Sequence, residues 1–250
     1  MRVTMIGAGY VGLVSGACFA DFGHHVTCID KDAQKVAALN RGGIPIFEPG
    51  LADLVEANVR QERLRFAVDT VSVGAAEAVF IAVGTPSRRG DGHADLSFVY
   101  DAVREIAPLL SAAAVVITKS TVPVGTGDEI ERILRDKRPD ADIQVVSNPE
   151  FLREGAAIRD FKHPDRIVVG TDDARARAAQ TYAKFLRKAH AQDTPLEDHR
   201  NVKPVPRRRS GEEPPPTQAT QVDKVVDVMM LELEEMEHRR QEAIKRQRGG

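Results

Sequence analysis

The chain has 250 residues with 35 basic and 37 acidic side chains, a formal net charge of -2. This near balance of charge gives no reason to expect nucleic acid or an anionic membrane as the main partner. The amino terminus has no basic stretch followed by an apolar core and a cleavage site, and no apolar run is long enough to span a bilayer, so we expect a cytoplasmic protein. The length allows one large domain or two small ones.

The first apolar run ends in a glycine-rich turn, Gly7-Ala8-Gly9-Tyr10-Val11-Gly12. Gly7 permits a tight turn off a strand, and Gly9 lets backbone N–H groups approach a pyrophosphate. Gly12 lets the amphipathic helix predicted over residues 11–22 pack closely on a sheet, with the pyrophosphate at the positive end of that helix. Glycines at this spacing also occur in ordinary turns, so the pattern alone leaves that alternative open.

The second apolar run, His25 to Ile29, ends in Asp30, which lies 21 residues after Gly9. A carboxylate at this spacing accepts hydrogen bonds from an adenosine ribose and repels a 2′-phosphate, so NAD is favoured over NADP as the cofactor. Lys31 and Lys35 weaken that exclusion. A fold of the same kind with no bound dinucleotide remains the alternative.

Strands and helices then alternate, which predicts an α/β fold: a Rossmann-like, doubly wound and mostly parallel sheet over residues 1–190. The further predicted strands cover residues 64–68, 78–83, 115–119, 143–147 and 166–170. Ligands bind such sheets beyond the carboxyl ends of the strands. We therefore expect the loops at that edge to form the binding site.

The two cysteines, Cys18 and Cys28, fall within the first predicted helix and the second predicted strand. Small thiols at such positions are typical of core packing. We expect neither of them to be a nucleophile, a metal ligand or half of a disulfide, and the sequence predicts no metal site.

Two loops at the predicted edge carry small polar residues. Gly84-Thr85-Pro86 either passes over the nicotinamide side of the cofactor or only ends a strand and turns the chain. In the second loop, which includes Ser120, Thr121 is expected to face the ligand and Thr126 to cap a helix that starts near Gly125.

A third loop, residues 147–155, carries Glu150 and Glu154 with Arg153 beside them. If the chain is helical from Glu150, both acids share one face, where one of them would orient or deprotonate a water molecule. The alternative is that they are first-turn acids that stabilise the helix dipole.

Together these motifs resemble the amino-terminal half of the UDP-glucose 6-dehydrogenase family, within the wider UDP-glucose/GDP-mannose dehydrogenase group. The resemblance covers residues 1 to about 188 and is carried by the segments 6–13, 47–51, 83–86, 120–126 and 148–155. It implies a four-electron oxidation of the C6 hydroxyl of UDP-glucose to a carboxylate, which consumes two NAD and passes through an aldehyde and an enzyme-bound thioester.

The resemblance also implies roles for individual residues. Thr121 and Glu154 would position the water that hydrolyses the thioester. The residues expected to bind NAD are Gly7, Gly9, Tyr10, Val11, Gly12, Asp30, Lys35, Gly84, Thr85, Pro86, Ser120, Thr121 and Glu154. Those expected along the nucleotide sugar are Glu150, Phe151, Leu152, Arg153 and Glu154.

The tail departs from the family pattern. Residues 191–221 are rich in proline and are predicted to be a disordered linker. Residues 222–248 carry apolar side chains at alternating spacings of four and three, which predicts a short amphipathic or coiled-coil helix. That helix is expected either to stand alone or to mediate a homo-oligomer or a contact with a partner helix.

The family's second domain, with its nucleophilic cysteine, has no counterpart in the sequence. Without that thiolate the covalent route is closed, so we expect this chain alone to be inactive in the full reaction. Three explanations stay open: a truncated or frameshifted product, which we favour; a separately encoded second half; and an NAD-binding module reused for regulation or assembly.

Overall fold

The computed structural model describes residues 1–88, 93–165, 167–170 and 196–198. Within these ranges, six parallel strands form one sheet in the order β3-β2-β1-β4-β5-β6. The strands are β1 (Arg2–Ile6), β2 (His25–Ile29), β3 (Leu64–Ala67), β4 (Ala78–Ile81), β5 (Val115–Thr118) and β6 (Gln144–Ser147). This order confirms the predicted doubly wound Rossmann-like fold.

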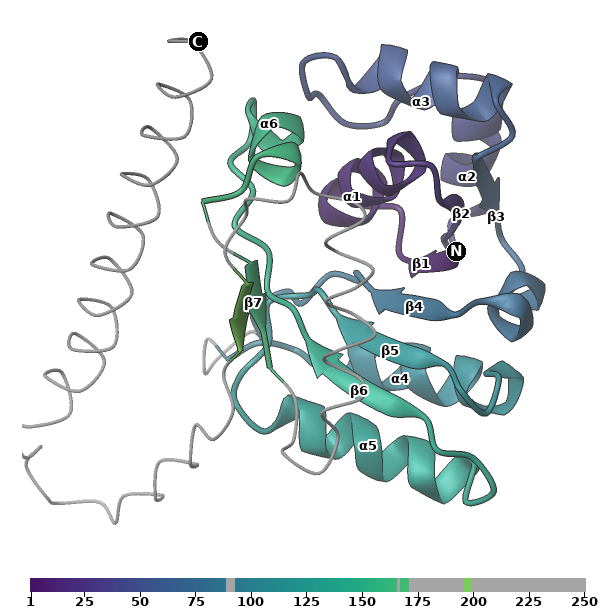
Figure 1. Cartoon of the computed structure of the whole chain (residues 1–250), viewed down its shortest axis with the longest axis vertical. Coiled ribbons are helices and arrows are strands. Elements are labelled where there is room, and N and C mark those ends of the chain that lie inside the picture. The colour runs from purple at the N-terminus through teal and green to yellow at the C-terminus, as the bar shows by residue number, and fades with distance from the viewer. Residues whose placement is uncertain (89–92, 166, 171–195, 199–250) are drawn as a thin grey trace, which may run out of the picture. The chain divides into compact units, whose positions relative to one another are not determined.

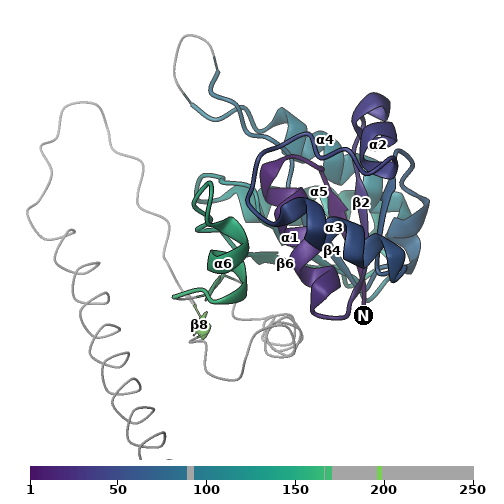
Figure 2. The same ribbon diagram turned by 90° about the horizontal axis from the view of Figure 1, so that it is seen from above.

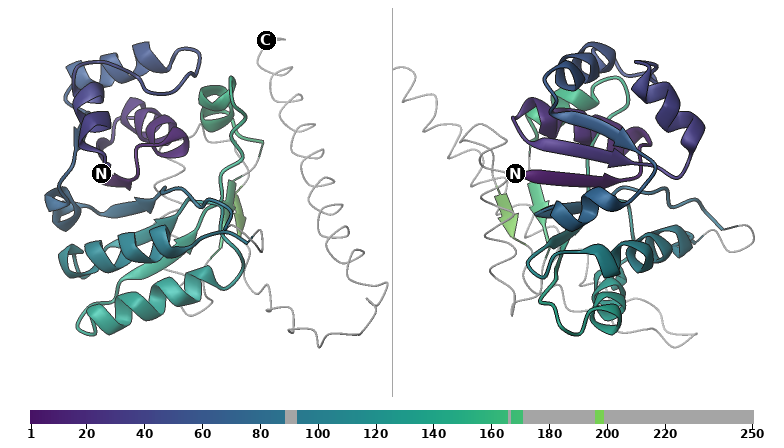
Figure 3. Two further views of the ribbon diagram at one scale, coloured as in Figure 1. Left: turned by 180° about the vertical axis from the view of Figure 1, so that it is seen from behind. Right: turned by 90° about the vertical axis from the view of Figure 1, so that its right-hand side faces the viewer.

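Helices cover both faces of the sheet (Figures 1 and 2). The α-helices are α1 (Tyr10–Asp21), α2 (Ala33–Asn40), α3 (Leu51–Arg60), α4 (Ser97–Ile106), α5 (Thr126–Lys137) and α6 (Ala157–Lys162). The described residues also include two short 3₁₀ helices, η1 (Val71–Ala75) and η2 (Ala107–Leu109). Helices α1, α3 and α6 lie on one side of the sheet, and α4 and α5 lie on the other (Figure 3).

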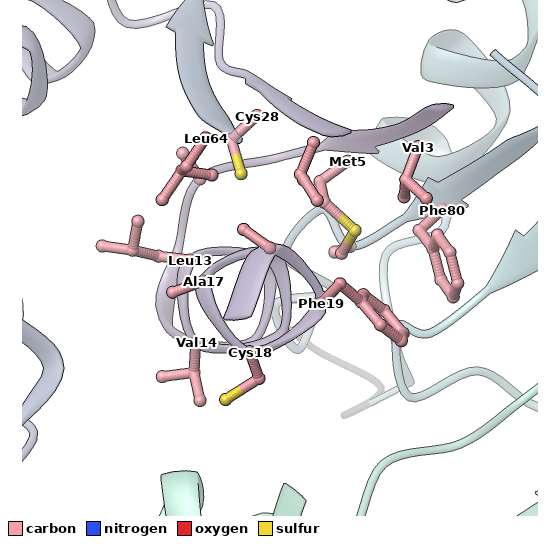
Figure 4. Packing of buried hydrophobic residues seen from close by; sticks show 14 of the residues in the cluster. Val3, Met5, Leu13, Val14, Ala17, Cys18, Phe19, Cys28, Leu64 and Phe80 are labelled. Carbon is pink, nitrogen blue, oxygen red and sulfur yellow. The ribbon is translucent and has the colours of Figure 1, made fainter. Parts of the chain in front are cut away.

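Each face of the sheet has its own apolar core, which explains why its strands read as nearly continuous apolar runs. On the α1 side, the ring of Phe19 packs 5.0 Å from that of Phe80 and 4.9 Å from that of Phe161. Figure 4 shows Phe19 and Phe80 among the buried side chains around α1. On the other side, side chains of α4 and α5 such as Val103 and Ile130 are fully buried.

Cys18 and Cys28 belong to the first of these cores, as predicted, and both are free thiols (Figure 4). Their side chains lie on opposite sides of the α1 axis. Burial raises the pKa of each thiol to about 12. Neither therefore supplies a thiolate near neutral pH.

The carboxyl-terminal part of the described chain differs from expectation in two places. The strand expected at residues 166–170 forms as β7 (Ile167–Val169), but outside the main sheet: it pairs in parallel with β8 (Leu196–Asp198). Strand β8 falls inside the predicted linker 191–221, where these three residues are extended and pair with β7. The rest of that linker and the predicted helix 222–248 lie outside the described residues.

Candidate functional site

All the sequence-predicted site residues follow strands at the carboxyl edge of the main sheet. The chain leaves this edge after β1, β2, β4, β5 and β6. Strands β1 and β4 are neighbours whose following connections run to opposite sides of the sheet, which is the switch point where doubly wound sheets bind ligands. The topology thus brings the five loops to one edge.

The glycine turn after β1 has the geometry that a dinucleotide requires. Gly7 has a φ of +105°, and its N–H donates to the carbonyl of Ile29 at 2.8 Å. A Cβ at Gly12 would lie 1.9 Å from the Gly7 carbonyl oxygen, so only glycine fits there. A Cβ at Gly9 would meet no atom of the described residues within 4 Å, which leaves open space beside the turn.

Helix α1 starts at Tyr10, directly after this turn. Among the described residues, no side chain caps its amino end, and its first turn carries no acid. Its first N–H groups, including that of Val11, are thus left for an anionic ligand. The open space at Gly9 and these amides fit the pyrophosphate of NAD.

Asp30 is tied to the same turn. Its carboxylate accepts hydrogen bonds from the N–H of Ala8 at 2.9 Å and of Asp32 at 3.0 Å, and from Lys35 Nζ at 2.8 Å. Burial acts to raise the pKa of Asp30, but these hydrogen bonds outweigh it and the pKa lies below its ordinary value. Asp30 is therefore a fixed carboxylate at the end of β2, while Lys31 turns away to pair with Glu105.

The loops after β4 and β5 are joined by hydrogen bonds. Thr85 Oγ1 donates to the carbonyl of Thr121 at 3.1 Å, and Ser120 Oγ donates to the carbonyl of Val83 at 2.7 Å. Gly84, Pro86 and Thr121 are exposed at the edge, whereas Ser120 is buried and its hydroxyl serves the loop itself.

The predicted capping role of Thr126 is wrong. Gly125, with a φ of +89°, is the N-cap of α5, and Thr126 is the first residue inside the helix. The Thr126 hydroxyl donates to the carbonyl of Pro123 at 2.7 Å instead of accepting from a helix amide.

The helix from Glu150 that would place both acids on one face does not form. Residues 150–153 are not helical, and α6 starts at Ala157. Two local features oppose an earlier start: the Glu150 side chain accepts from the N–H of Leu152 at 2.8 Å, and Gly155 has a φ of +83°. Glu150 and Glu154 therefore share a loop, and neither is a first-turn acid of α6.

Arg153 is held by α6. Its guanidinium contacts the carboxylate of Asp160 at 2.9 and 2.6 Å, and its N–H donates to the same carboxylate at 3.0 Å. This bidentate pair lowers the pKa of Asp160 to about 2. Phe151 and Glu154 are exposed, and Leu152 is half-buried. Of the five residues expected along the nucleotide sugar, Glu150 and Arg153 thus have side chains engaged by hydrogen bonds within the chain.

Two residues of the site escaped the predicted assignments. Glu48, in the loop between α2 and α3, is 6% exposed and accepts hydrogen bonds from Tyr10 Oη and from the N–H groups of Gly155 and Ala157. The sequence feature that could have identified Glu48 as a site residue is its place as an acid inside the Gly/Pro-containing segment Phe47–Leu51. Because its partners lie up to 109 residues away along the chain, local sequence patterns do not reveal its contacts.

Lys119 is the second such residue. It ends the β5 run, is 6% exposed, and donates from Nζ to Asn148 Oδ1 at 3.1 Å. Asn148 in turn donates from Nδ2 to the carbonyl of Val168 at 2.7 Å. Burial lowers the pKa of Lys119 to about 8. The buried cation therefore links β5 to the start of the 147–155 loop.

Comparison with known proteins decides the family. Residues 1–186 match the model of the NAD binding domain of the UDP-glucose/GDP-mannose dehydrogenase family. The chain belongs to this family. Its NAD-binding domain assigns NAD as the cofactor and agrees with the geometry of the glycine turn and Asp30.

Curated relatives support the same assignment. The chain is 64% identical over 197 residues to the UDP-glucose 6-dehydrogenase of Rhizobium meliloti (strain 1021), covering 78% of this chain and 45% of that protein. It is 45% identical over 194 residues to the UDP-glucose 6-dehydrogenase of Pseudomonas aeruginosa, covering 75% of this chain and 43% of the relative. The chain thus spans less than half the length of these relatives.

Solved structures show the same fold. A UDP-glucose dehydrogenase from Pyrobaculum islandicum superposes with a TM-score of 0.72 at 39% identity, covering 79% of this chain and 45% of that one. A GDP-mannose dehydrogenase from Pseudomonas aeruginosa gives a TM-score of 0.71 at 32% identity, covering 79% and 46%. None of the helices in the part of the chain that the structure describes could span a lipid bilayer.

Proposed function

We propose that this chain supplies the NAD-binding half of a dehydrogenase that oxidises the C6 hydroxyl of UDP-glucose to a carboxylate. The observation that carries the proposal is the convergence of the glycine turn, Asp30 and the loops after β4, β5 and β6 on one sheet edge. The names of the relatives from Rhizobium meliloti and Pseudomonas aeruginosa support UDP-glucose as the sugar nucleotide.

The proposed role of each site residue follows from its position at the sheet edge. Gly9, Val11 and the start of α1 bind the pyrophosphate, and Asp30 with Lys35 binds the adenosine ribose. Bound NAD supplies the hydride acceptor. Thr121 and Glu154, both exposed at the edge, position the water, and residues 150–154 lie along the nucleotide sugar.

We infer that the full reaction needs a thiolate which this chain does not supply. Its two cysteines, Cys18 and Cys28, are buried in the core with their pKa values raised to about 12 by that burial. A thiol in that state does not attack an aldehyde carbon near neutral pH. The nucleophile therefore has to come from a second half.

Complementation in trans tests this proposal. The purified chain is mixed with the carboxyl-terminal half of the Rhizobium meliloti enzyme, and NADH absorbance is followed with UDP-glucose. We expect turnover with the added half and none without it. A Glu154→Gln variant should slow the hydrolytic half of the reaction. Hydride transfer with no added half would contradict the claim of inactivity.

The burial of both cysteines also favours a second candidate, a non-catalytic NAD-binding module that assembles through residues 222–248. It predicts NAD binding without complementation, and an assembly that disappears when residues 195–250 are deleted. Light scattering on the full chain and on the deletion measures this. An oligomeric state that the deletion leaves unchanged would eliminate assembly through that segment.

A further inference from the structure

Glu48 forms a junction between parts of the chain that are distant in sequence. Its carboxylate accepts from the phenol of Tyr10, 38 residues away, and from the N–H groups of Gly155 at 2.8 Å and Ala157 at 2.9 Å. The first partner opens helix α1 beside the glycine turn, and the other two follow the 150–154 segment. One side chain thus contacts both the cofactor-binding and the substrate-binding elements.

The junction is built for an ionised carboxylate. Burial acts to raise the pKa of Glu48, but the hydrogen bonds from Tyr10, Gly155 and Ala157 outweigh it, and the pKa lies below its ordinary value. Burial and the neighbouring carboxylate raise the pKa of Tyr10, so its phenol keeps the proton that it donates. Hydrogen bonds to a charged acceptor are shorter and stronger than neutral ones.

The position of Tyr10 makes this junction sensitive to the cofactor. Tyr10 directly follows Gly9, beside which the structure leaves open space, and its backbone belongs to the turn that would meet the pyrophosphate. Its ring packs against the α1 core, which restricts the movement of the phenol relative to that turn. Ordering the turn therefore orders the donor to Glu48.

We propose that Glu48 is a positioning residue that couples NAD binding to the shape of the nucleotide-sugar segment: NAD fixes Tyr10, Tyr10 fixes Glu48, and Glu48 holds the amides of Gly155 and Ala157. The inference rests on the proposed function. It assigns to Glu48 no contact with cofactor or substrate, only the alignment of Glu150 and Glu154 through the backbone that follows them.

Amide hydrogen exchange with and without saturating NAD tests this coupling in the full chain. In the wild type we expect NAD to slow exchange at Gly155 and Ala157 about tenfold, the factor that corresponds to strengthening one charge-assisted hydrogen bond. Glu48→Gln removes the negative charge and places an NH₂ group opposite the hydrogen-bond donors that now face the carboxylate. This variant should abolish the NAD-dependent slowing of exchange. Tyr10→Phe, which removes only the phenolic hydroxyl and keeps the ring, should do the same at saturating NAD.

Glu77→Gln is the matched control, because Glu77 also accepts a backbone N–H, that of Arg2 at 2.9 Å, but at the amino edge of the sheet. It should keep the NAD-dependent slowing. If Glu48→Gln does not fold, as judged by exchange in β1 and β4, Tyr10→Phe decides.

The outcomes separate the two proposals. NAD binding with no change at Gly155 and Ala157 in the wild type would overturn the coupling and leave the proposed function standing. Equal slowing in the wild type and in Tyr10→Phe would overturn it as well. No NAD binding by the wild type would overturn both the coupling and the proposed function.

Discussion

Replacing Gly9 with alanine tests directly whether the turn after β1 binds the pyrophosphate. Gly9 has φ -77° and ψ -165°, an extended conformation that alanine adopts, and the added Cβ meets no described atom within 4 Å. The fold should therefore tolerate the change, with an unfolding free energy equal to that of the wild type or up to about 1 kcal/mol higher. Any loss of NAD affinity then reports on the ligand.

The expected loss follows from the hydrogen bonds that the methyl group displaces. Each backbone N–H bonded to a charged phosphate contributes about 1.5–3 kcal/mol, so pushing the pyrophosphate off one amide should raise the Kd for NAD about 10- to 150-fold. Calorimetric titration measures the Kd, and thermal unfolding checks the fold. A Gly9→Ala protein that binds NAD as tightly as the wild type would refute the placement of the pyrophosphate.

Gly12→Ala is the matched control within the same turn. Its Cβ would lie 1.9 Å from the Gly7 carbonyl oxygen and 3.4 Å from Ala82 Cβ, so the backbone has to shift. Overpacking of this kind costs about 1–3 kcal/mol, which lowers the melting temperature of a domain this size by about 2–4 °C per kcal/mol. Loss of stability in Gly12→Ala but not in Gly9→Ala separates folding from binding.

Two further substitutions test single side chains of the site. Asp30→Ala should weaken NAD binding by about 0.5–3 kcal/mol in calorimetry while the fold survives, and an unchanged affinity would remove Asp30 from the ribose site. Lys119→Met should stabilise the protein by up to about 3 kcal/mol at pH 7, because burial lowers the Lys119 pKa from 10.5 to about 8 and the folded state carries a penalised charge. Between pH 8 and 10.5 the unfolded wild type binds more protons at Lys119 than the folded state does. The unfolding free energy of the wild type therefore rises relative to that of Lys119→Met as the pH increases through this range. If the melting temperatures of the wild type and of Lys119→Met differ by the same amount at every pH from 7 to 10, this reasoning is contradicted.

The sheet was predictable from the sequence because its central strands, such as β4 and β5, are buried along their whole length and are largely apolar in sequence, whereas the edge strand β3 alternates buried and more exposed residues. The glycine turn was predictable for a different reason. Gly7 and Gly12 are required by backbone geometry, a positive φ in one case and a 1.9 Å approach in the other, and such requirements are visible in the residue type. The sequence position of β7 was predicted correctly, but its place in the main sheet was not, because an apolar run does not indicate which strand it pairs with.

The loop chemistry was harder to predict, because it depends on competing local hydrogen bonds. The spacing of Glu150 and Glu154 suits a helix, but the Glu150 carboxylate bonds the N–H of Leu152 and Gly155 takes a positive φ. Thr126 is a good cap by residue type, yet Gly125 occupies the N-cap position. Glu48 was missed as a site residue because all its partners come from distant parts of the chain.

Calorimetric titration of the purified chain with NAD and then with UDP-glucose, followed by an NADH absorbance assay on the same sample, tests the central claim most directly. The claim is that residues 1–186 form an NAD-binding domain of the UDP-glucose/GDP-mannose dehydrogenase family and that neither Cys18 nor Cys28 serves as the nucleophile of the reaction. We predict NAD binding with no NADH produced. Absence of NAD binding, or NADH that appears only when UDP-glucose is added, would contradict it.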